Sequence, residues 1–150
     1  MEKILEYFKN NKVLNGYFRY VEPEELKENI DPEMYEIEGE FTPFAISVFG
    51  EVLFIEDNEY VSVINYAMDK CDTASHIDTF LEQLEDKDFV FDWFILDLYE
   101  EAKVKHGEVN ETQIYGFVPF VFLGGSVDVN SLDKCDWKVH LYLIHQYLSQ

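Results

Sequence analysis

Four histidines are the side chains best suited to acid–base or metal chemistry near neutral pH, but their spacing matches no known site. They are His76, His106, His140 and His145. None lies in an HExxH pair or in another zinc-binding pattern. His140 and His145 are five residues apart, so a helix would not place both rings on one face. For His140 we predict a helix histidine hydrogen-bonded near the core, in preference to a metal ligand or a base.

The pair Gly124-Gly125 invites comparison with phosphate-binding loops, but its context differs from theirs. A P-loop requires Gly-Lys-Ser/Thr, and the dinucleotide fingerprint requires three spaced glycines before a helix. Here Ser126 follows the pair, and the next lysine is Lys134. We therefore predict a turn at the end of a strand, where glycine supplies a positive φ.

Motifs for nucleophilic or carboxylate chemistry are also missing. The serines lack a GxSxG elbow, and Cys71 and Cys135 form no CxxC pair. Asp57, Glu59 and Asp69 would have to meet to bind a divalent cation, and no EF-hand loop holds them. The sequence predicts a protein that is not an enzyme, with no cofactor and no metal. The cysteines fit two buried thiols in a reducing compartment, with a single disulfide as the alternative.

The composition indicates one folded domain. The chain has 150 residues, of which 47% are hydrophobic and 17% aromatic, and this is ample for a single core. The N-terminus has no long apolar segment with a small-residue cleavage site, so it does not resemble a signal peptide. No run approaches the roughly 20 apolar residues of a membrane span. We expect one compact domain over residues 1–150, in the cytoplasm.

Net charge restricts the class of partner. Eleven Lys and Arg residues stand against 31 Asp and Glu residues, which gives a net charge of −20. Such a chain is repelled by nucleic-acid phosphates and by anionic membranes. It is suited to a basic protein partner, which its field would attract. The alternative is that the acidity only confers solubility.

The acids are concentrated between Glu22 and Glu59, where 13 acids accompany one base, Lys27. Apolar and aromatic residues are interleaved with them: Tyr35, Ile37, Phe41, Phe44 and Phe49. Rings inside a charged rim are typical of a binding surface; the alternative places the rings in the core and only the acids in water. The candidate partner-binding residues are Glu22, Glu24, Glu25, Glu28, Asp31, Glu33, Glu36, Glu38, Glu56, Asp57 and Glu59.

The first half of the chain predicts a short helix, a strand and a hairpin. Apolar residues at helical spacing fall within residues 1–10, and residues 17–20 fit a loop or short strand. Glu22-Pro23 begins a short helix, which Asp31-Pro32 ends. Residues 51–55 and 60–66 predict two strands joined by a four-residue loop. Residues 60–66 alternate, with one apolar face and one mixed face.

The next segment predicts two helices. Ser75 or Asp72 would cap the first, whose apolar stripe spans residues 77–84. The second would run over residues 91–105 and end before Gly107. Its expected buried stripe is Phe91, Phe94, Ile95, Leu98 and Ala102.

The C-terminal segment predicts a strand and a final helix. Residues 116–123 read as a strand with Pro119 at an edge or bulge. A helix then begins near Asp136-Trp137 and turns Trp137, Leu141 and Ile144 to one face. The order of elements predicts an α+β fold. Its sheet is antiparallel or mixed, has a central hairpin, and packs against several amphipathic helices.

The sequence from Tyr115 onward, YGFVPFVFLGG followed by NSLDKCDWKVHLYLIHQYL, resembles the C-terminal domain of type VI secretion DNase-immunity proteins. It departs from the family pattern at Phe120 and Val121, where Ala-Leu is usual, and it has one extra residue before Leu132. The matching positions are Tyr115, Gly116, Phe117, Pro119, Leu123, Gly124, Gly125, Leu132, His140 and Leu141.

Upstream, FTPFAISVFGEVLFIEDNEYVSVINY is similar to the GAD-like domain of the same proteins. The two resemblances imply a GAD-like part over about residues 17–105 and an immunity part over about residues 106–150, sharing one core. They carry over a structural motif of Gly116, Pro119, Gly124, Gly125 and His140, and no catalytic residue.

The resemblance implies an immunity protein that binds a cognate secreted toxin, a nuclease, and blocks its basic active-site surface. Two alternatives remain. One is an acidic adaptor or regulatory domain without a toxin. The other is a small-molecule-binding protein or enzyme with a pocket lined by Tyr and Trp.

Overall fold

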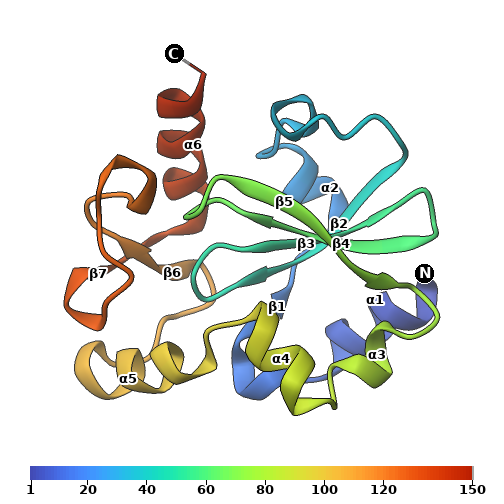
Figure 1. The fold of residues 1–150 in the computed structure, drawn as a ribbon, viewed down its shortest axis with the longest axis horizontal. Helices are drawn as coiled ribbons and strands as arrows, with labels where there is room; N and C mark the ends of the chain where they lie inside the picture. Colours follow the sequence, from blue (N-terminus) through green and yellow to red (C-terminus); the bar gives the residue numbers. More distant parts are fainter. Residues whose placement is uncertain (150) are drawn as a thin grey trace.

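The protein, described over residues 1–149 by a computed structural model, is built on an antiparallel sheet in the order β1-β2-β3-β4-β5 (Figure 1). Consecutive strands pair with each other throughout. Their bounds are β1 Phe18–Tyr20, β2 Phe41–Ser47, β3 Val52–Glu56, β4 Tyr60–Asn65 and β5 Lys70–His76. The predicted α+β class and the predicted hairpin, β3–β4, are confirmed.

A separate two-stranded ribbon and six α-helices complete the described chain. In the ribbon, β6 (Gln113–Phe117) pairs antiparallel with β7 (Leu132–Asp136). The first and last helices begin close to where the sequence predicts them. The helices are α1 Glu2–Asn10, α2 Pro23–Lys27, α3 Phe80–Gln83, α4 Lys87–Trp93, α5 Leu96–His106 and α6 Trp137–Leu148.

Both faces of the sheet are buried. Side chains alternate across a strand, so in β3 Leu53 faces one apolar cluster, with residues of α1, α3 and α5, while Phe54 faces the other, with residues of α2 and α6. The strand therefore reads as a continuous apolar run. The face of β4 that the sequence predicts to be mixed carries Tyr60, which is exposed, and Ser62 and Ile64, which are buried.

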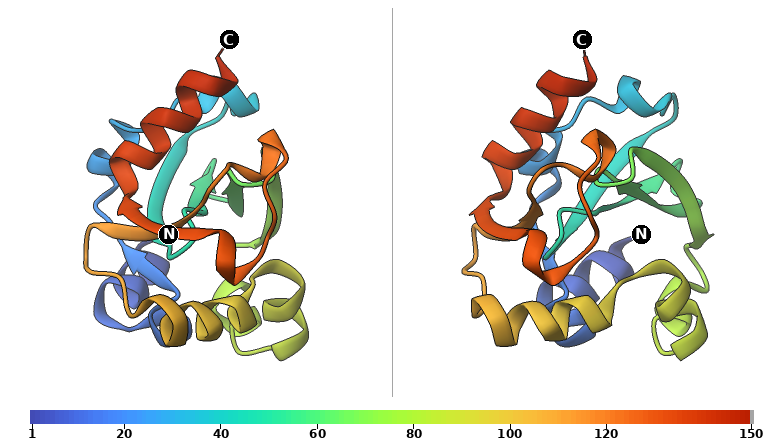
Figure 2. Two further views of the ribbon diagram at one scale, coloured as in Figure 1. Left: turned by 90° about the vertical axis from the view of Figure 1, so that its left-hand side faces the viewer. Right: turned by 60° about the vertical axis from the view of Figure 1, so that its left-hand side comes forward.

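The C-terminal ribbon lies against one end of the sheet (Figure 2). The backbone N–H of Tyr115 donates to Val48 O at 2.7 Å, which joins β6 to the β2–β3 connection. Trp137 and Leu141 of α6 belong to the same apolar cluster as Phe54. These contacts hold residues 113–148 to the five-stranded sheet.

The segment at 70–84 differs from the prediction. Asp72 and Ser75 cap no helix; they lie in β5, a polar edge strand that β4 pairs through its backbone. Only Phe80–Gln83 is helical, and Thr79 is its N-cap. The apolar stripe was read correctly as buried at Phe80, but it belongs to a single turn.

The single helix expected over residues 91–105 is two helices. The chain is extended at Phe94, with φ −131° and ψ 151°. This break turns the Phe94 ring onto Phe18 at 4.8 Å between centroids, and it lets Tyr17 accept the Ile95 N–H at 3.3 Å. The expected buried stripe was wrong at Phe91 and Ile95, which are 76% and 39% exposed.

The strand expected over residues 116–123 ends at Phe117, its last partner being Leu132. Proline has no N–H to continue a ladder, and the Val118-Pro119 peptide is cis. A 3₁₀ turn follows at Val121–Leu123, before Gly124 at φ 97°. The positive φ that the sequence predicts at the glycine pair is thus present at Gly124.

Candidate functional site

The predicted acidic surface divides into two parts in the structure. Acids of the first part surround α2, and several have cationic partners. Glu22 lies 3.9 Å from Lys9 Nζ, and Glu25 lies 3.0 Å from Lys138 Nζ on α6. Glu24 pairs with Lys27 within the helix, while Glu28 is exposed. Surface pairs of this kind contribute little stability, but they neutralise part of the predicted patch.

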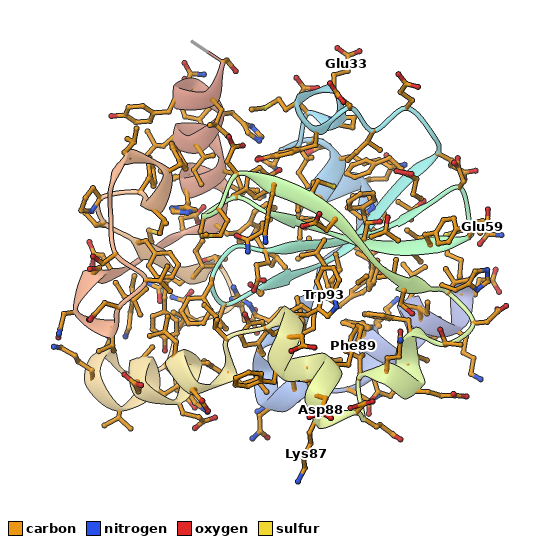
Figure 3. All side chains as sticks on the ribbon, in the orientation of Figure 1. Glu33, Glu59, Lys87, Asp88, Phe89 and Trp93 are labelled. Carbon is orange, nitrogen blue, oxygen red and sulfur yellow. The ribbon has the colours of Figure 1, made fainter. Side chains whose placement is uncertain are left out.

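The second part carries uncompensated charge. No Lys, Arg or His occurs between residues 28 and 59, and no ion pair is formed there within residues 1–149. Asp31 caps a 3₁₀ turn by accepting the Glu33 N–H at 3.0 Å. Glu33, Glu36 and Glu38 are exposed, and Figure 3 shows Glu33 pointing into solvent.

The β3–β4 loop joins this second part. Asp57 accepts the Glu40 N–H at 2.8 Å, and its own N–H donates to Glu40 O at 2.9 Å. Glu59 is exposed and Glu56 half-buried. The segment preceding β2 and the hairpin loop, far apart in sequence, therefore lie side by side.

The interleaved rings do not join this surface as anchors: Phe44 and Phe49 are buried, as is Ile37, while Tyr35 and Phe41 are half-buried.

The residues proposed as a structural motif pack on one another. A Cβ on Gly116 would lie 2.9 Å from both Cys135 Sγ and His140 Cε1, so only glycine fits between β7 and α6. A Cβ on Gly125 would lie 2.0 Å from Pro119 O. These close approaches explain why small residues stand at these positions.

His140 is buried at the N-terminal half of α6. Its Nδ1 lies 3.7 Å from Cys135 Sγ, and its ring packs edge-on against Phe120. Burial lowers the pKa of His140 to about 4, and burial also raises the pKa of Cys135 to about 11. At neutral pH both groups are uncharged, so this pair offers neither a thiolate nor an imidazolium.

The acids once considered as a cation site are held elsewhere. Asp57 is occupied by the Glu40 backbone, and Asp69 accepts from Tyr35 Oη at 3.1 Å. Over residues 1–149, no three His, Cys, Asp or Glu side chains are placed to hold a metal ion.

Both cysteines are free and half-buried. No helix in the described part of the chain is long and apolar enough to cross a membrane.

A buried polar network centres on Glu51, which the sequence analysis did not single out. Glu51 lies between the turn at residues 48–50 and the start of β3, and it is 5% exposed. Its Oε1 accepts hydrogen bonds from Tyr17 Oη and from Ser47 Oγ, the latter at 3.0 Å. Ser47 Oγ in turn accepts the Glu51 N–H at 3.0 Å. Burial raises the pKa of Glu51 to about 7, although both hydrogen bonds oppose this shift.

Glu51 lies at an apolar groove, here called the aromatic groove, with a volume of about 590 Å³. Its walls are Phe49, Val63, Trp93, Phe94 and Phe117. Figure 3 shows Trp93 between α4 and the sheet, whereas Lys87 and Asp88 of the same helix point away. The volume is in the range of small-molecule pockets, about 300–1,000 Å³.

The rim of the aromatic groove mixes exposed apolar and charged side chains. Phe91 and Met68 are 76% and 51% exposed. Lys70 lies 3.9 Å from Asp72, and Asp92 is a further rim acid. One sequence signal marked this place in advance: Glu51 is a single acid inside the apolar run VFGEVLF.

Comparison with known proteins relates the C-terminal part of the chain to a family. Residues 74–147, slightly less than half of the chain, match the family model described as "T6SS immunity protein Tdi1, C-terminal". No curated protein matches the sequence. The resemblance of the C-terminal part to a type VI secretion immunity family is thereby confirmed, while the DNase target and the GAD-like assignment of the preceding part stay predictions.

One solved structure resembles nearly the whole chain. It is described as "Crystal structure of Atu4351 from Agrobacterium tumefaciens" and superposes with a TM-score of 0.71 at 16% sequence identity. The superposition covers 97% of this chain and 75% of that chain. At this identity the likeness concerns the fold alone.

Proposed function

We propose that this protein is an immunity protein, which binds a toxin delivered by a type VI secretion system and neutralises it. The observation that carries the proposal is the match of residues 74–147 to the Tdi1 immunity family. An inhibitor acts by occupying its target, so the proposal needs no catalytic residue.

The toxin is proposed to be a nuclease, and charge supports this choice. A nuclease presents a basic surface to phosphates, and a protein with net charge −20 is complementary to such a surface. The acids between residues 28 and 59 have no cations among them in sequence, and within residues 1–149 they form no ion pairs. Charge complementarity would speed encounter and orient the two proteins.

Co-expression tests the function directly. The product of the neighbouring gene is expressed in bacteria alone, with this protein, and with an unrelated acidic protein of similar size. We expect growth arrest in the first and third cases, rescue in the second, and co-purification of a stable complex. A toxic neighbour that is neither rescued nor bound would contradict the immunity proposal. Rescue without loss of DNA or RNA cleavage activity would contradict active-site blocking.

A further inference from the structure

The aromatic groove has features of a binding site that the immunity proposal does not require. Glu51 is a buried acid, and burying an ionisable group is unfavourable unless partners compensate for its lost hydration. Its two hydrogen bonds both go to Oε1. Oε2 accepts neither of these bonds, and it is not fully enclosed by other protein atoms. Glu51 lines the groove together with Asn65, Lys70, Asp72 and Asp92, and Oε2 is the oxygen of the Glu51 carboxyl left to accept a bond from an occupant.

The walls select the kind of occupant. Phe49, Trp93, Phe94 and Phe117 line the groove, and aromatic side chains bind apolar groups and attract cations through their π-electrons. A carboxyl oxygen accepts hydrogen bonds or pairs with a positive charge. An anionic ligand would meet this carboxyl and a protein of net charge −20, so it is disfavoured.

We propose that the aromatic groove binds an organic ammonium group on an apolar stem, with the ammonium donating to Glu51 Oε2 and the stem lying along the aromatic walls. Tyr17 and Ser47 position the carboxyl by holding Oε1. Because a bound cation favours the ionised acid, binding releases the Glu51 proton when it starts from the protonated form. Affinity should therefore increase as the pH rises toward 8.

Two sources supply this chemistry: a free amine, or a lysine side chain of a bound protein. The inference stands apart from the immunity proposal, because a free amine can occupy the groove in the absence of any toxin. A lysine of the toxin would deepen that proposal by adding an anchor to the acidic surface.

Calorimetry with 2-phenylethylamine tests the site. The neutral isostere 2-phenylethanol and the anion 3-phenylpropionate are the matched probes. We expect the amine to bind the wild-type protein at least tenfold more tightly than either probe at pH 8, and several-fold more weakly at pH 6. E51Q should remove most of this preference for the amine while leaving the weak binding of the alcohol unchanged. Equal binding of the three probes, or no binding of the amine at concentrations up to about 20 mM, would overturn the proposal.

A second measurement uses the wild-type chain, so its result does not depend on whether E51Q folds. The side-chain carboxyl carbon of Glu51 is followed by NMR through a pH titration with and without the amine. The expected result is a lower apparent pKa of Glu51 when the amine is present; an unchanged titration would overturn the proposal. With the toxin in hand, displacement of bound amine by the toxin indicates the lysine source, and simultaneous binding indicates a free amine.

Discussion

At the scale of single residues, burial shifts the pKa values of Glu51 and His140 in opposite directions, and each shift favours the uncharged form. Burial raises the pKa of Glu51 to about 7 and lowers that of His140 to about 4. Both groups are therefore held uncharged over the interval in which an unfolded chain would ionise them. Their effects on stability have opposite slopes, because one group keeps a proton on folding and the other loses one.

The pH dependence of the free energy of unfolding should show these two opposite contributions. From about pH 4.5 to 7, folded Glu51 retains a proton that the unfolded chain has released, so its contribution falls as the pH rises. From about pH 6.5 down to 4, folded His140 stays neutral while the unfolded chain binds a proton, so its contribution falls as the pH drops. In the wild-type protein these two slopes partly cancel near pH 5–6.

E51Q removes the contribution of Glu51 to the pH dependence of stability, and it keeps a side-chain acceptor for Tyr17 and Ser47. Relative to their difference at pH 4.5, we expect the variant to gain up to about 3 kcal/mol over the wild type by pH 8, since each pKa unit corresponds to about 1.4 kcal/mol. Urea unfolding at several pH values gives the difference curve, in which the other acids cancel. Parallel curves for the two proteins would show that Glu51 titrates normally in the fold.

At the scale of elements, the sequence predicted those whose apolar pattern is local. Residues 51–66 contain two apolar runs separated by a polar loop, and they form β3 and β4. The final helix was found from its stripe and from Asp136, whose side chain accepts the Lys138 N–H at 2.9 Å. Strand β5, KCDTASH, was missed because an edge strand needs only backbone partners and carries polar side chains.

Other features depend on contacts between distant segments, which a local pattern does not contain. The break at Phe94 depends on Tyr17 and Phe18, which lie more than 70 residues earlier. The candidate site shows the same limit. The acidic segment 22–59 was recognised from composition, but its junction with the hairpin loop depends on the Asp57–Glu40 pair. The aromatic groove collects residues from five separate parts of the chain.

The contact between β6 and α6 makes a prediction at this scale. Gly116→Ala would force a methyl group against Cys135 and His140, each 2.9 Å from the new Cβ, and overpacking of this kind costs about 1–3 kcal/mol. Replacing Cys135 by Ala in the same protein should restore part of the loss, and a double-mutant cycle of unfolding free energies measures it. Gly124→Ala is the control, because its Cβ meets nothing within 4 Å and only the positive φ opposes it. Additive effects of the Gly116 and Cys135 substitutions would contradict the packing argument.

At the scale of the whole molecule, charge and apolar surface are arranged separately. The uncompensated acids lie along the segment before β2 and the β3–β4 loop, while the aromatic groove lies between the sheet and the break that separates α4 from α5. Glu33 and Asp88 mark opposite sides of the molecule in Figure 3. Acids at these two places contribute equally to the net charge. They differ in how strongly they attract and orient a basic partner that approaches one side of the molecule.

A pair of charge-matched variants separates these contributions. E33K/E36K/E38K changes the proposed contact surface, and E82K/E85K/D88K makes the same change in net charge near α3 and α4. We expect the first variant to slow association with the toxin about tenfold or more at low salt, and the second to slow it much less, because oriented steering depends on local potential. Stopped-flow mixing at low salt and at about 0.5 M salt should show the gap closing as screening increases. Equal slowing by both variants would mean that net charge alone attracts the toxin, and that the binding surface lies outside residues 33–38.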